Sequence, residues 1–414
     1  MERVITVIDL KAFYAYVECV DRGIDPWKSP LVVCDKERGS NTIILSVSPY
    51  LKARGVPSRL RFKELPKGFD YIYALPRMER YIQMSGEVVK VFLDFFSGSD
   101  IHVYSIDESF IDLTSYISYY KKSGLEIVEM VKEEIKKRTG LQATAGIGDN
   151  FFLAKVALDI FAKHAPNGIG ILHKEDVETK LWPITPLKEI WGIGERLQLR
   201  LNQMGIYKVE ELAKADRLMI ANELGIMGDQ LVDHANGIDN SDIHEIYIPE
   251  ETSLTIGQTL ARNYSMTEVP IILREMNDDL CMKLRSQEET TKVIHLFIGY
   301  ASDQGGFSHQ MALDRPTNDT DTIYKAIMII YNKYIVDKPI RQISIVFGKL
   351  RPINNTEQLD LFESIEEIDN MRNLNKVLDE LRFKYGKDTV LRASALTDES
   401  TALDRHALIG GHRK

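Results

Sequence analysis

The order of apolar segments in the N-terminal part of the chain most constrains its fold. A β-branched run at residues 3–8 leads into a segment with helical spacing, and a long amphipathic helix is predicted at 78–96. Two strands flank an acidic pair within 102–113, and a helix at 125–138 and a strand at 142–147 come next, before another helix. The predicted order is therefore strand, helix, strand pair, helix, strand and helix. This is the order of a ferredoxin-like α+β sheet, so we expect such a sheet here.

Composition narrows the class of protein. The length of 414 residues favours two to four domains, and 44% hydrophobic with 27% charged residues exclude disorder on a large scale. Three widely spaced cysteines exclude a disulfide framework and a cysteine zinc site. With no signal peptide and no apolar run near the roughly 20 residues that span a bilayer, we expect a cytoplasmic protein without a membrane partner. The net charge of −9 restricts any nucleic-acid contact to local basic patches.

The rest of the chain divides into smaller modules. Two short strands at 30–34 and 42–47 indicate a small β-containing module, and short helices joined by a glycine turn are expected after residue 168. A polar stretch at 236–251 is typical of a linker.

A second α/β module is predicted from residue 252 to about 350. Its periodicity predicts helices at 271–285 and 321–334 and strands at 292–300 and 341–348. One further helix, at 371–385, precedes a polar tail for which mobility is the simplest expectation.

Three carboxylates lie where strands end. Asp9 closes the first strand, and Asp107 and Glu108 lie at the tip of the strand pair. Neighbouring residues on a straight strand point to opposite faces, so both acids of the pair reach one ion only if the backbone turns or bulges there. Such oxygen ligands suit Mg²⁺, and a pair of ions could stabilise the attacking and leaving oxygens of a nucleotidyl transfer. Taken singly, each acid is more typical of a cap or of solvated surface charge.

Two other features suit phosphate groups. Lys155 lies one turn into the helix that follows the Gly-Ile-Gly-Asp-Asn segment at 146–150, where its ammonium could meet a polyphosphate. Gly192 and Gly194 open a helix, whose N–H groups and positive dipole end could bind a nucleic-acid phosphate. A solvated lysine and a tight turn are the simpler interpretations of each feature alone.

Four segments carry a resemblance to a known family. They are Asp-Leu-Lys-Ala-Phe-Tyr-Ala from Asp9, Tyr-Ser-Ile-Asp-Glu-Ser-Phe-Ile-Asp from Tyr104, Ala-Gly-Ile-Gly-Asp-Asn-Phe-Phe-Leu-Ala-Lys from Ala145, and the glycine turn. Their order and spacing resemble the Y-family translesion DNA polymerases, most closely the UmuC-like branch. The resemblance implies an α+β multidomain right-hand polymerase with a ferredoxin-like palm, small fingers, a helix-hairpin-helix thumb and an α/β little finger. The implied boundaries are a palm at 1–24 and 81–168, fingers at 25–80, a thumb at 169–240, a linker at 241–251, a little finger at 252–352 and a tail at 353–414.

The resemblance also assigns roles to the acids. It implies that Asp9, Asp107 and the carbonyl of Leu10 hold two Mg²⁺ ions, and Mn²⁺ would suit the same oxygens. It implies that Glu108 completes the site beside the primer 3′-OH. The implied activity is error-prone, template-directed transfer of dNMP to a primer in the response to DNA damage.

The resemblance further assigns residues to the incoming nucleotide. Phe13 and Tyr14 match the aromatic pair under the dNTP, with Tyr14 as the steric gate against a ribose 2′-OH. Lys155 matches the triphosphate lysine of the family. Lys52 takes a slot where many members carry arginine, and Pro49 takes the slot of a tyrosine, so the point charge is kept without the bidentate guanidinium.

Partners follow from the C-terminal part. The segment Gln-Leu-Asp-Leu-Phe resembles the pentapeptide that binds the bacterial sliding clamp, and its anchors are Gln358, Leu359, Leu361 and Phe362. The resemblance also implies primer-template DNA, dNTP, and an UmuD-like subunit or a recombinase filament. Basic residues of the second module, Arg262 and Arg285 among them, would grip the DNA.

Two alternatives stay open. A nucleotide cyclase places paired carboxylates and two metals on the same kind of sheet, but it needs neither the glycine turn nor the clamp peptide. A catalytically weak or inactive accessory protein would bind DNA and the clamp and dispense with the chemistry.

Overall fold

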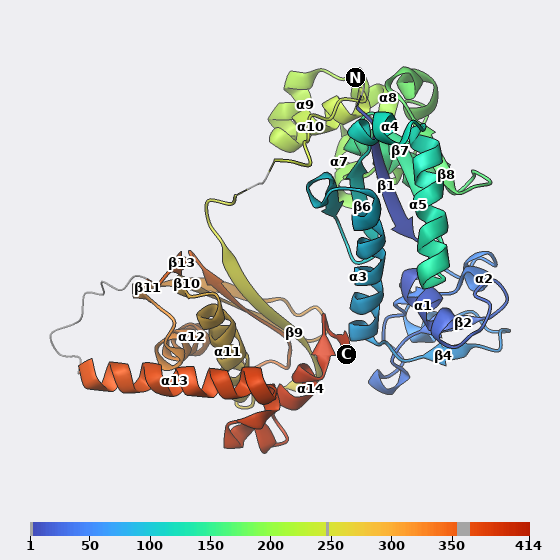
Figure 1. Ribbon diagram of the computed structural model, residues 1–414. Helices are drawn as coiled ribbons and strands as arrows, with labels where there is room; N and C mark the ends of the chain where they lie inside the picture. The colour runs from blue at the N-terminus through green and yellow to red at the C-terminus, as the bar shows by residue number, and fades with distance from the viewer. Residues whose placement is uncertain (1–2, 246–247, 354–364) are drawn as a thin grey trace. The chain divides into compact units, whose positions relative to one another are not determined.

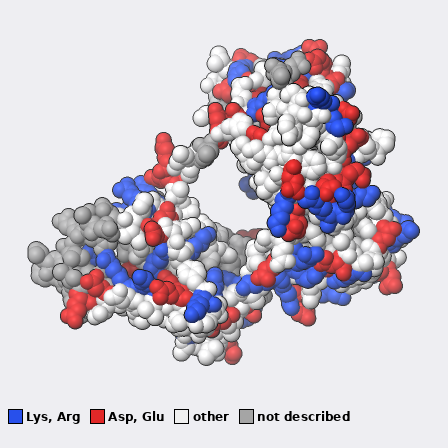
Figure 2. Space-filling model, in the orientation of Figure 1, with Lys and Arg blue, Asp and Glu red and all other residues white. Residues whose placement is uncertain are grey.

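The computed structural model describes residues 3–245, 248–353 and 365–414 (Figure 1). These residues belong to two compact units, Met1–Tyr247 and Ile248–Lys414. Among the described residues, none of the helices has the length and apolarity required to cross a membrane. On the face shown in Figure 2, basic and acidic side chains are interspersed over the surface of each unit.

A five-stranded sheet forms the centre of the first unit. Its strands run in the order β5-β6-β1-β7-β8. They are β1 (Ile5–Leu10), β5 (Ile101–Val103), β6 (Glu108–Asp112), β7 (Ala143–Gly148) and β8 (Ile169–Leu172). β1 pairs antiparallel with β6 and β7, whereas β8 runs parallel to β7. The ferredoxin-like order is confirmed in β1, β5, β6 and β7, and β8 adds a strand where short helices were expected.

Helices pack against this sheet. α3 (Met78–Phe95) and α5 (Gly124–Thr139) contact each other, and α5 also contacts β7. α4 (Thr114–Tyr120) connects β6 to α5. α6 (Phe151–Val156) continues into a π-helical turn and lies against β1 and β7. The helices predicted at 78–96 and 125–138 are therefore confirmed.

The glycines of β7 allow α6 to lie directly on the sheet. A Cβ added to Gly146 would collide with the carbonyl oxygen of Ala154, and one added to Gly148 would collide with the backbone of Leu153. Asn150 caps α6 by accepting the N–H of Leu153 at 2.8 Å. The close packing of α6 on β7 thus explains why residues 146 and 148 are glycines.

A separate three-stranded sheet, β3-β2-β4, follows α1 (Phe13–Asp21). Its strands are β2 (Leu31–Val33), β3 (Ser46–Val47) and β4 (Ile72–Ala74), and α1 packs against β2 and β3. α2 (Pro49–Lys52) begins with proline, whose fixed φ suits the first helical turn. The two predicted strands are present, and β4 is an additional short strand parallel to β2.

Four helices complete the first unit: α7 (Glu195–Gln203), α8 (Val209–Ala213), α9 (Arg217–Leu224) and α10 (Ile226–Ala235). Their buried residues share one core with Phe152, Leu153 and Val156 of α6. The helical character expected after residue 168 is therefore confirmed, with more helices than the sequence suggested.

The second unit has its own sheet, in the order β11-β10-β12-β9 with every pairing antiparallel. The strands are β9 (Ser253–Tyr264), β10 (Glu289–Tyr300), β11 (Gly306–Thr317), β12 (Ile340–Gly348) and β13 (Arg351–Pro352), which pairs with β10. α11 (Val269–Ser286) and α12 (Thr320–Tyr334) bury their apolar sides in the same core as the sheet. The predicted strands and helices of this module are confirmed, whereas β9 and β11 were not predicted.

The polar tail is folded, contrary to the expectation of mobility. α13 (Ile365–Tyr385) is followed by α14 (Ala402–His406) and a hairpin of β14 (Leu408–Ile409) and β15 (His412–Arg413). Acidic residues of α11 bind this extension: Arg405 Nη2 lies 2.8 Å from Asp279, and Arg392 Nε lies 2.6 Å from Asp278. The extension is held by ion pairs, which produce no apolar periodicity in the sequence. Its fold after α13 was therefore not predicted.

Candidate active site

The acids predicted from the sequence meet at one edge of the five-stranded sheet. β1 and β6 pair so that Asp9 lies directly opposite Glu108. One residue further, the Leu10 amide donates to the carbonyl oxygen of Asp107 at 2.9 Å. The chain bends immediately before β6, where the Ser105 hydroxyl donates to Asp107 Oδ1 at 2.8 Å. The turn that two neighbouring acids require is therefore present.

The pKa of Asp9 responds to its buried position beside the other acids. Burial raises the pKa of Asp9 to about 7, and the charges of Asp107 and Glu108 add to this effect. Lys155 and Lys52 act in the opposite direction. Burial is the largest cause, so the raised pKa of Asp9 is that of a buried acid beside two other carboxylates, and the two lysines offset it only in part.

Glu108 and Lys155 form a buried ion pair. Lys155 Nζ lies 2.8 Å from Glu108 Oε1 and 3.2 Å from Asp159 Oδ1, and both Lys155 and Glu108 are buried. Burial raises the pKa of Glu108, although Lys155 opposes the effect. Burial acts to lower the pKa of Lys155, but the contact with Glu108 leaves it raised. The lysine predicted to bind a triphosphate is thus charged and held by two carboxylates.

A divalent cation fits the other acids by its chemistry. Among the described residues, no group of three or more His, Cys, Asp and Glu side chains is arranged to hold a metal ion. Since Glu108 is paired with Lys155, the donors available are the Asp9 and Asp107 carboxylates and the Leu10 carbonyl. All are hard oxygens of the kind that Mg²⁺ prefers. A bound cation would favour the charged form of Asp9, whose pKa is raised by burial and by the neighbouring carboxylates.

Phe13 and Tyr14 differ in their surroundings. Ala12, with a left-handed φ of 48°, turns the chain from β1 into α1. Phe13 is buried, whereas Tyr14 is partly exposed and its ring centroid lies 4.7 Å from that of Tyr81. Burial raises the pKa of the Tyr14 hydroxyl, and the Asp107 carboxylate adds to the effect. Of the two rings, Tyr14 is therefore the one placed to meet a ligand beside the acids.

A buried network behind Tyr14 was missed in the sequence. Tyr81 of α3 is fully buried, and its hydroxyl donates to Glu18 Oε1 at 2.8 Å. Arg77 Nε donates to the same oxygen at 2.8 Å, and Arg22 lies 2.9 Å from Glu18 Oε2. The available signal was Glu18 itself, an acid inside an apolar helical run, where burial requires a charged partner.

Lys52 completes the charged surroundings of the acids. It is the last residue of α2, and Pro49 is the first. Partial burial lowers the pKa of Lys52, whereas the charges of Asp9 and Asp107 act to raise it. The cation predicted to take the arginine slot therefore interacts with the acidic edge through space.

Gly192 and Gly194 lie at the start of α7. Gly192 has a φ of 90°, Gly194 directly precedes the helix, and open space surrounds the position of a Cβ on either residue. The preceding Trp191 ring lies 6.1 Å from Tyr104 and 6.2 Å from Phe110, centroid to centroid. The glycine turn therefore begins against the strand pair that carries the acids and leaves the N-terminus of α7 open.

The predicted clamp-binding residues and the basic residues predicted to grip DNA lie in the C-terminal part of the chain. Four predicted clamp-binding residues lie outside the described residues: Gln358, Leu359, Leu361 and Phe362. Arg262 and Arg285 of the second unit are engaged within the protein, 2.7 Å from Glu268 and 2.6 Å from Asp379 respectively. These two guanidinium groups therefore contribute to the fold of the second unit, and their contact with DNA stays a prediction.

Three family models match the chain. The impB/mucB/samB family matches residues 8–159, which include all three acids and Lys155. The IMS family HHH motif matches residues 174–206, which include the glycine turn. The impB/mucB/samB family C-terminal domain matches residues 251–361.

Relatives match over the whole length. "Putative UV-damage repair protein UvrX" of Bacillus subtilis (strain 168) is 35% identical over 413 residues, covering 99% of this chain and 97% of the relative. "DNA polymerase IV 2" of the same organism is 30% identical over 419 residues, covering 100% and 99%. The fold is similar to the solved "Y-family DNA polymerase chimera Dbh-Dpo4(243-245)-Dbh", with a TM-score of 0.69 and 21% identity over 84% of this chain and 100% of that one. The chain therefore belongs to the impB/mucB/samB family, the Y-family of DNA-directed DNA polymerases.

Proposed function

We propose that this polymerase carries out error-prone translesion synthesis, in which dNMP is added to a primer 3′-OH opposite damaged template bases. The observation that carries the proposal is the meeting of Asp9 and Asp107 at the edge of a ferredoxin-like sheet, beside the Glu108–Lys155 pair. Two relatives agree in name, one as a UV-damage repair protein and one as a DNA polymerase IV. The proposal includes the UmuC-like branch of the family and a cytoplasmic location.

In the proposed reaction Asp9 and Asp107 bind metal ions, and Glu108 acts beside the primer 3′-OH. Asp9, Asp107 and the Leu10 carbonyl would hold two Mg²⁺ ions, for which Mn²⁺ could substitute. Bound there, the ions would supply positive charge for the attacking and leaving oxygens. Glu108 holds the Lys155 ammonium at 2.8 Å. An incoming triphosphate would compete with Glu108 for Lys155, and the exchange would free the carboxylate of Glu108 to face the primer 3′-OH.

Nucleotide selection is assigned to α1 and α2. Tyr14 presents its ring beside the acids, where a ribose 2′-OH would clash with it, and Phe13 supports the ring from the core. Lys52 supplies a point charge for the triphosphate. The adjacent sheet has strands of only two or three residues, a small structure with little mass to check the shape of a nascent base pair.

The remaining assignments of the polymerase hand are part of the same proposal. The palm is 1–24 and 81–168, the fingers 25–80, the thumb 169–240, the linker 241–251, the little finger 252–352 and the tail 353–414. Main-chain N–H groups at Gly192 and Gly194 contact a DNA phosphate, which agrees with the open start of α7. The proposed partners are primer-template DNA, dNTP, the sliding clamp, and an UmuD-like subunit or a recombinase filament.

Primer extension on undamaged and abasic templates, with Mg²⁺ and dNTPs, tests the proposal. Wild type is compared with Asp107→Asn and with Glu87→Gln, a matched control on the exposed side of α3. We expect extension on both templates by wild type and Glu87→Gln, none by Asp107→Asn, and DNA binding by all three. Synthesis by Asp107→Asn would overturn the assigned site. Wild type that binds DNA without extending it would favour the accessory alternative.

A further inference from the structure

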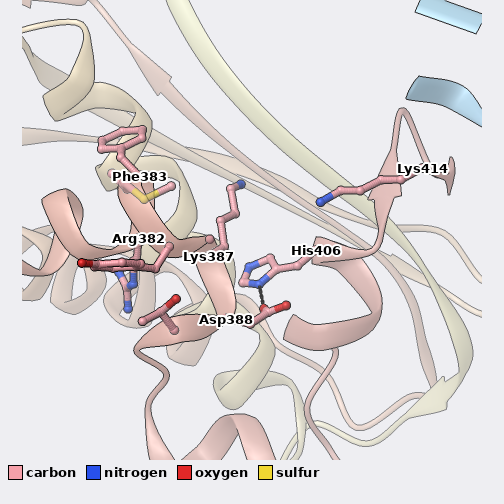
Figure 3. A pocket seen from close by; sticks show the side chains of 10 residues that line it. Arg382, Phe383, Lys387, Asp388, His406 and Lys414 are labelled. Atoms are coloured by element: carbon pink, nitrogen blue, oxygen red, sulfur yellow. Dashed lines mark hydrogen bonds and ion pairs between the residues drawn. The ribbon is translucent and has the colours of Figure 1, made fainter. Parts of the chain in front are cut away.

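The C-terminal extension forms a cavity of about 510 Å³ that plays no part in the proposed polymerase site. The end of α13, the turn after it, α14 and the last residue line this cavity (Figure 3). Figure 3 shows Lys387 and Lys414 extending over the same side of the His406 ring, with their ammonium ends directed toward each other. The cavity thus brings together cations from segments that are distant in the sequence.

The lining carries a clear excess of positive charge. Arg382, Lys387, His406 and Lys414 all line the cavity, and Asp388 is the one acidic side chain among the described residues of the lining. Within the described part of the chain, Arg382, Lys387 and Lys414 have no ion-pair partner, and the Arg382 guanidinium donates only to the backbone carbonyl of Val390, at 3.1 Å. This concentration of charge is notable in a chain whose net charge is −9.

The acid in the lining is already engaged. Asp388 Oδ1 lies 2.6 Å from His406 Nδ1, and His406 Nε2 lies 2.9 Å from Asp279 Oδ1. A carboxylate at each ring nitrogen favours the imidazolium, and the pKa of His406 is raised by these contacts although burial acts to lower it. Arg405 also binds Asp279, at 2.8 Å, so the floor of the cavity is held rigidly. Lys387 lies near enough to Asp279 to favour its charge, but among the described residues Arg382, Lys387 and Lys414 make no direct ion pair.

Two aromatic rings lie beside these cations. Phe383 and Tyr385 line the cavity and are each 61% exposed, so both rings are open to a ligand. Exposed rings next to lysines are the combination that binds nucleotides, with the base stacked on a ring and the phosphate on the cations.

We propose that this cavity binds the phosphate of a nucleotide, either free or at the end of a nucleic-acid strand, independently of the polymerase site. Lys387, Lys414 and Arg382 contact the phosphate oxygens, His406 shapes the floor, and Phe383 stacks on the base. A free nucleotide and a strand end present the same phosphate and base to the cavity. They differ only in the nucleic-acid chain that is attached to the strand end.

Binding to the full-length protein in EDTA tests the proposal, since EDTA removes binding that depends on a metal at the acids. The probes are pyrophosphate, dAMP and a fluorescent 5′-phosphorylated oligothymidylate. The test variant is the double change Lys387→Glu with Lys414→Glu, and the control is Lys325→Glu, an exposed lysine of α12 outside the cavity. Lys387 and Lys414 are exposed and make no direct ion pair among the described residues, but Lys387 favours the charge on Asp279, so the double variant should melt slightly below wild type and every binding measurement is made well below its melting temperature.

We expect the double variant to bind dAMP and the oligonucleotide at least tenfold more weakly, and the Lys325→Glu variant to bind as wild type does. Phe383→Ala should weaken binding of dAMP but not of pyrophosphate. A larger loss of affinity for the oligonucleotide than for dAMP in the double variant would identify a strand end as the source, and the reverse a free nucleotide. In hydrogen exchange, ligand should protect residues 382–390 and 402–414. Wild-type affinity in the double variant, or no binding by wild type at millimolar concentration, would overturn the proposal.

Discussion

Tyr81 is expected to determine how firmly Tyr14 is held as a gate against ribonucleotides. Tyr81 is fully buried, its ring lies 4.7 Å from that of Tyr14, and its hydroxyl donates to Glu18 at 2.8 Å. A gate excludes a 2′-OH only if its ring cannot retreat, and the ring of Tyr81 fills the space behind it. Tyr81→Leu removes the backing ring, whereas Tyr81→Phe keeps the ring and removes only the hydroxyl.

The magnitudes separate the two variants. An aromatic pair contributes about 0.5–1.5 kcal/mol beyond the burial of its area, so losing the ring should lower discrimination against rNTP about twofold to 13-fold. A hydrogen bond to a charged group contributes about 1.5–3 kcal/mol to stability. Tyr81→Phe should therefore lower the free energy of unfolding by this amount and leave discrimination against rNTP unchanged. Tyr81→Leu should lower both.

Single-nucleotide insertion measures the effect as the ratio of kcat/KM for a dNTP to that for the matching rNTP. The assay is run well below the melting temperature of each variant, with Tyr14→Ala as the variant that lacks the gate. An unchanged ratio in Tyr81→Leu, beside a collapsed ratio in Tyr14→Ala, would refute the backing role of Tyr81. An unchanged ratio in Tyr14→Ala would instead refute the gate.

Three more predictions concern the sheet, the extension and the tail. Gly146→Ala should destabilise the first unit by about 3 kcal/mol in chemical denaturation because its Cβ would meet the α6 backbone, whereas Gly86→Ala, in open space within α3, should stabilise it by about 0.5–1 kcal/mol; equal effects would contradict the packing argument. Burial acts to raise the pKa of Asp279, but His406 and nearby cations lower it to about 2, so the stability that the Asp279 carboxylate contributes is present above pH 3.8 and is lost as the pH falls towards 2. Asp279→Asn should flatten this part of the curve of stability against pH, and an unchanged curve would count against the ion pairs. Deleting residues 358–362 should abolish stimulation of primer extension by the clamp and leave clamp-free extension intact, and retained stimulation would remove the clamp assignment.

Elements with strong local periodicity were predictable from the sequence. The apolar spacing of residues 78–96 and 125–138 corresponds to α3 and α5, because a helix that buries one face repeats that face every three or four residues. β9 and β11 were missed since one face of each strand is exposed and carries polar residues, which weakens the apolar signal. β8 was missed because it is short and directly follows a glycine turn.

The acidic site was predictable in its residues but not in its partners. Motif order placed Asp9, Asp107 and Glu108 together, and the β1–β6 register does the same. The pairing of Glu108 with Lys155 was not predictable, because it joins side chains from β6 and α6 through the packing of that helix on the sheet. The Tyr81–Glu18 contact likewise joins two helices, α3 and α1.

By itself, the sequence of this protein determined the local elements with strong apolar periodicity, the order of the ferredoxin-like sheet and the acids at its edge, since periodicity and motif spacing are properties of neighbouring residues. Only the tertiary structure decided which charges neutralise one another and where the C-terminal extension lies. Arg392, Arg405 and His406 bind Asp278 and Asp279 more than a hundred residues away. The physical reason is that an ion pair depends on distance in space, and that distance is set only when the whole chain packs.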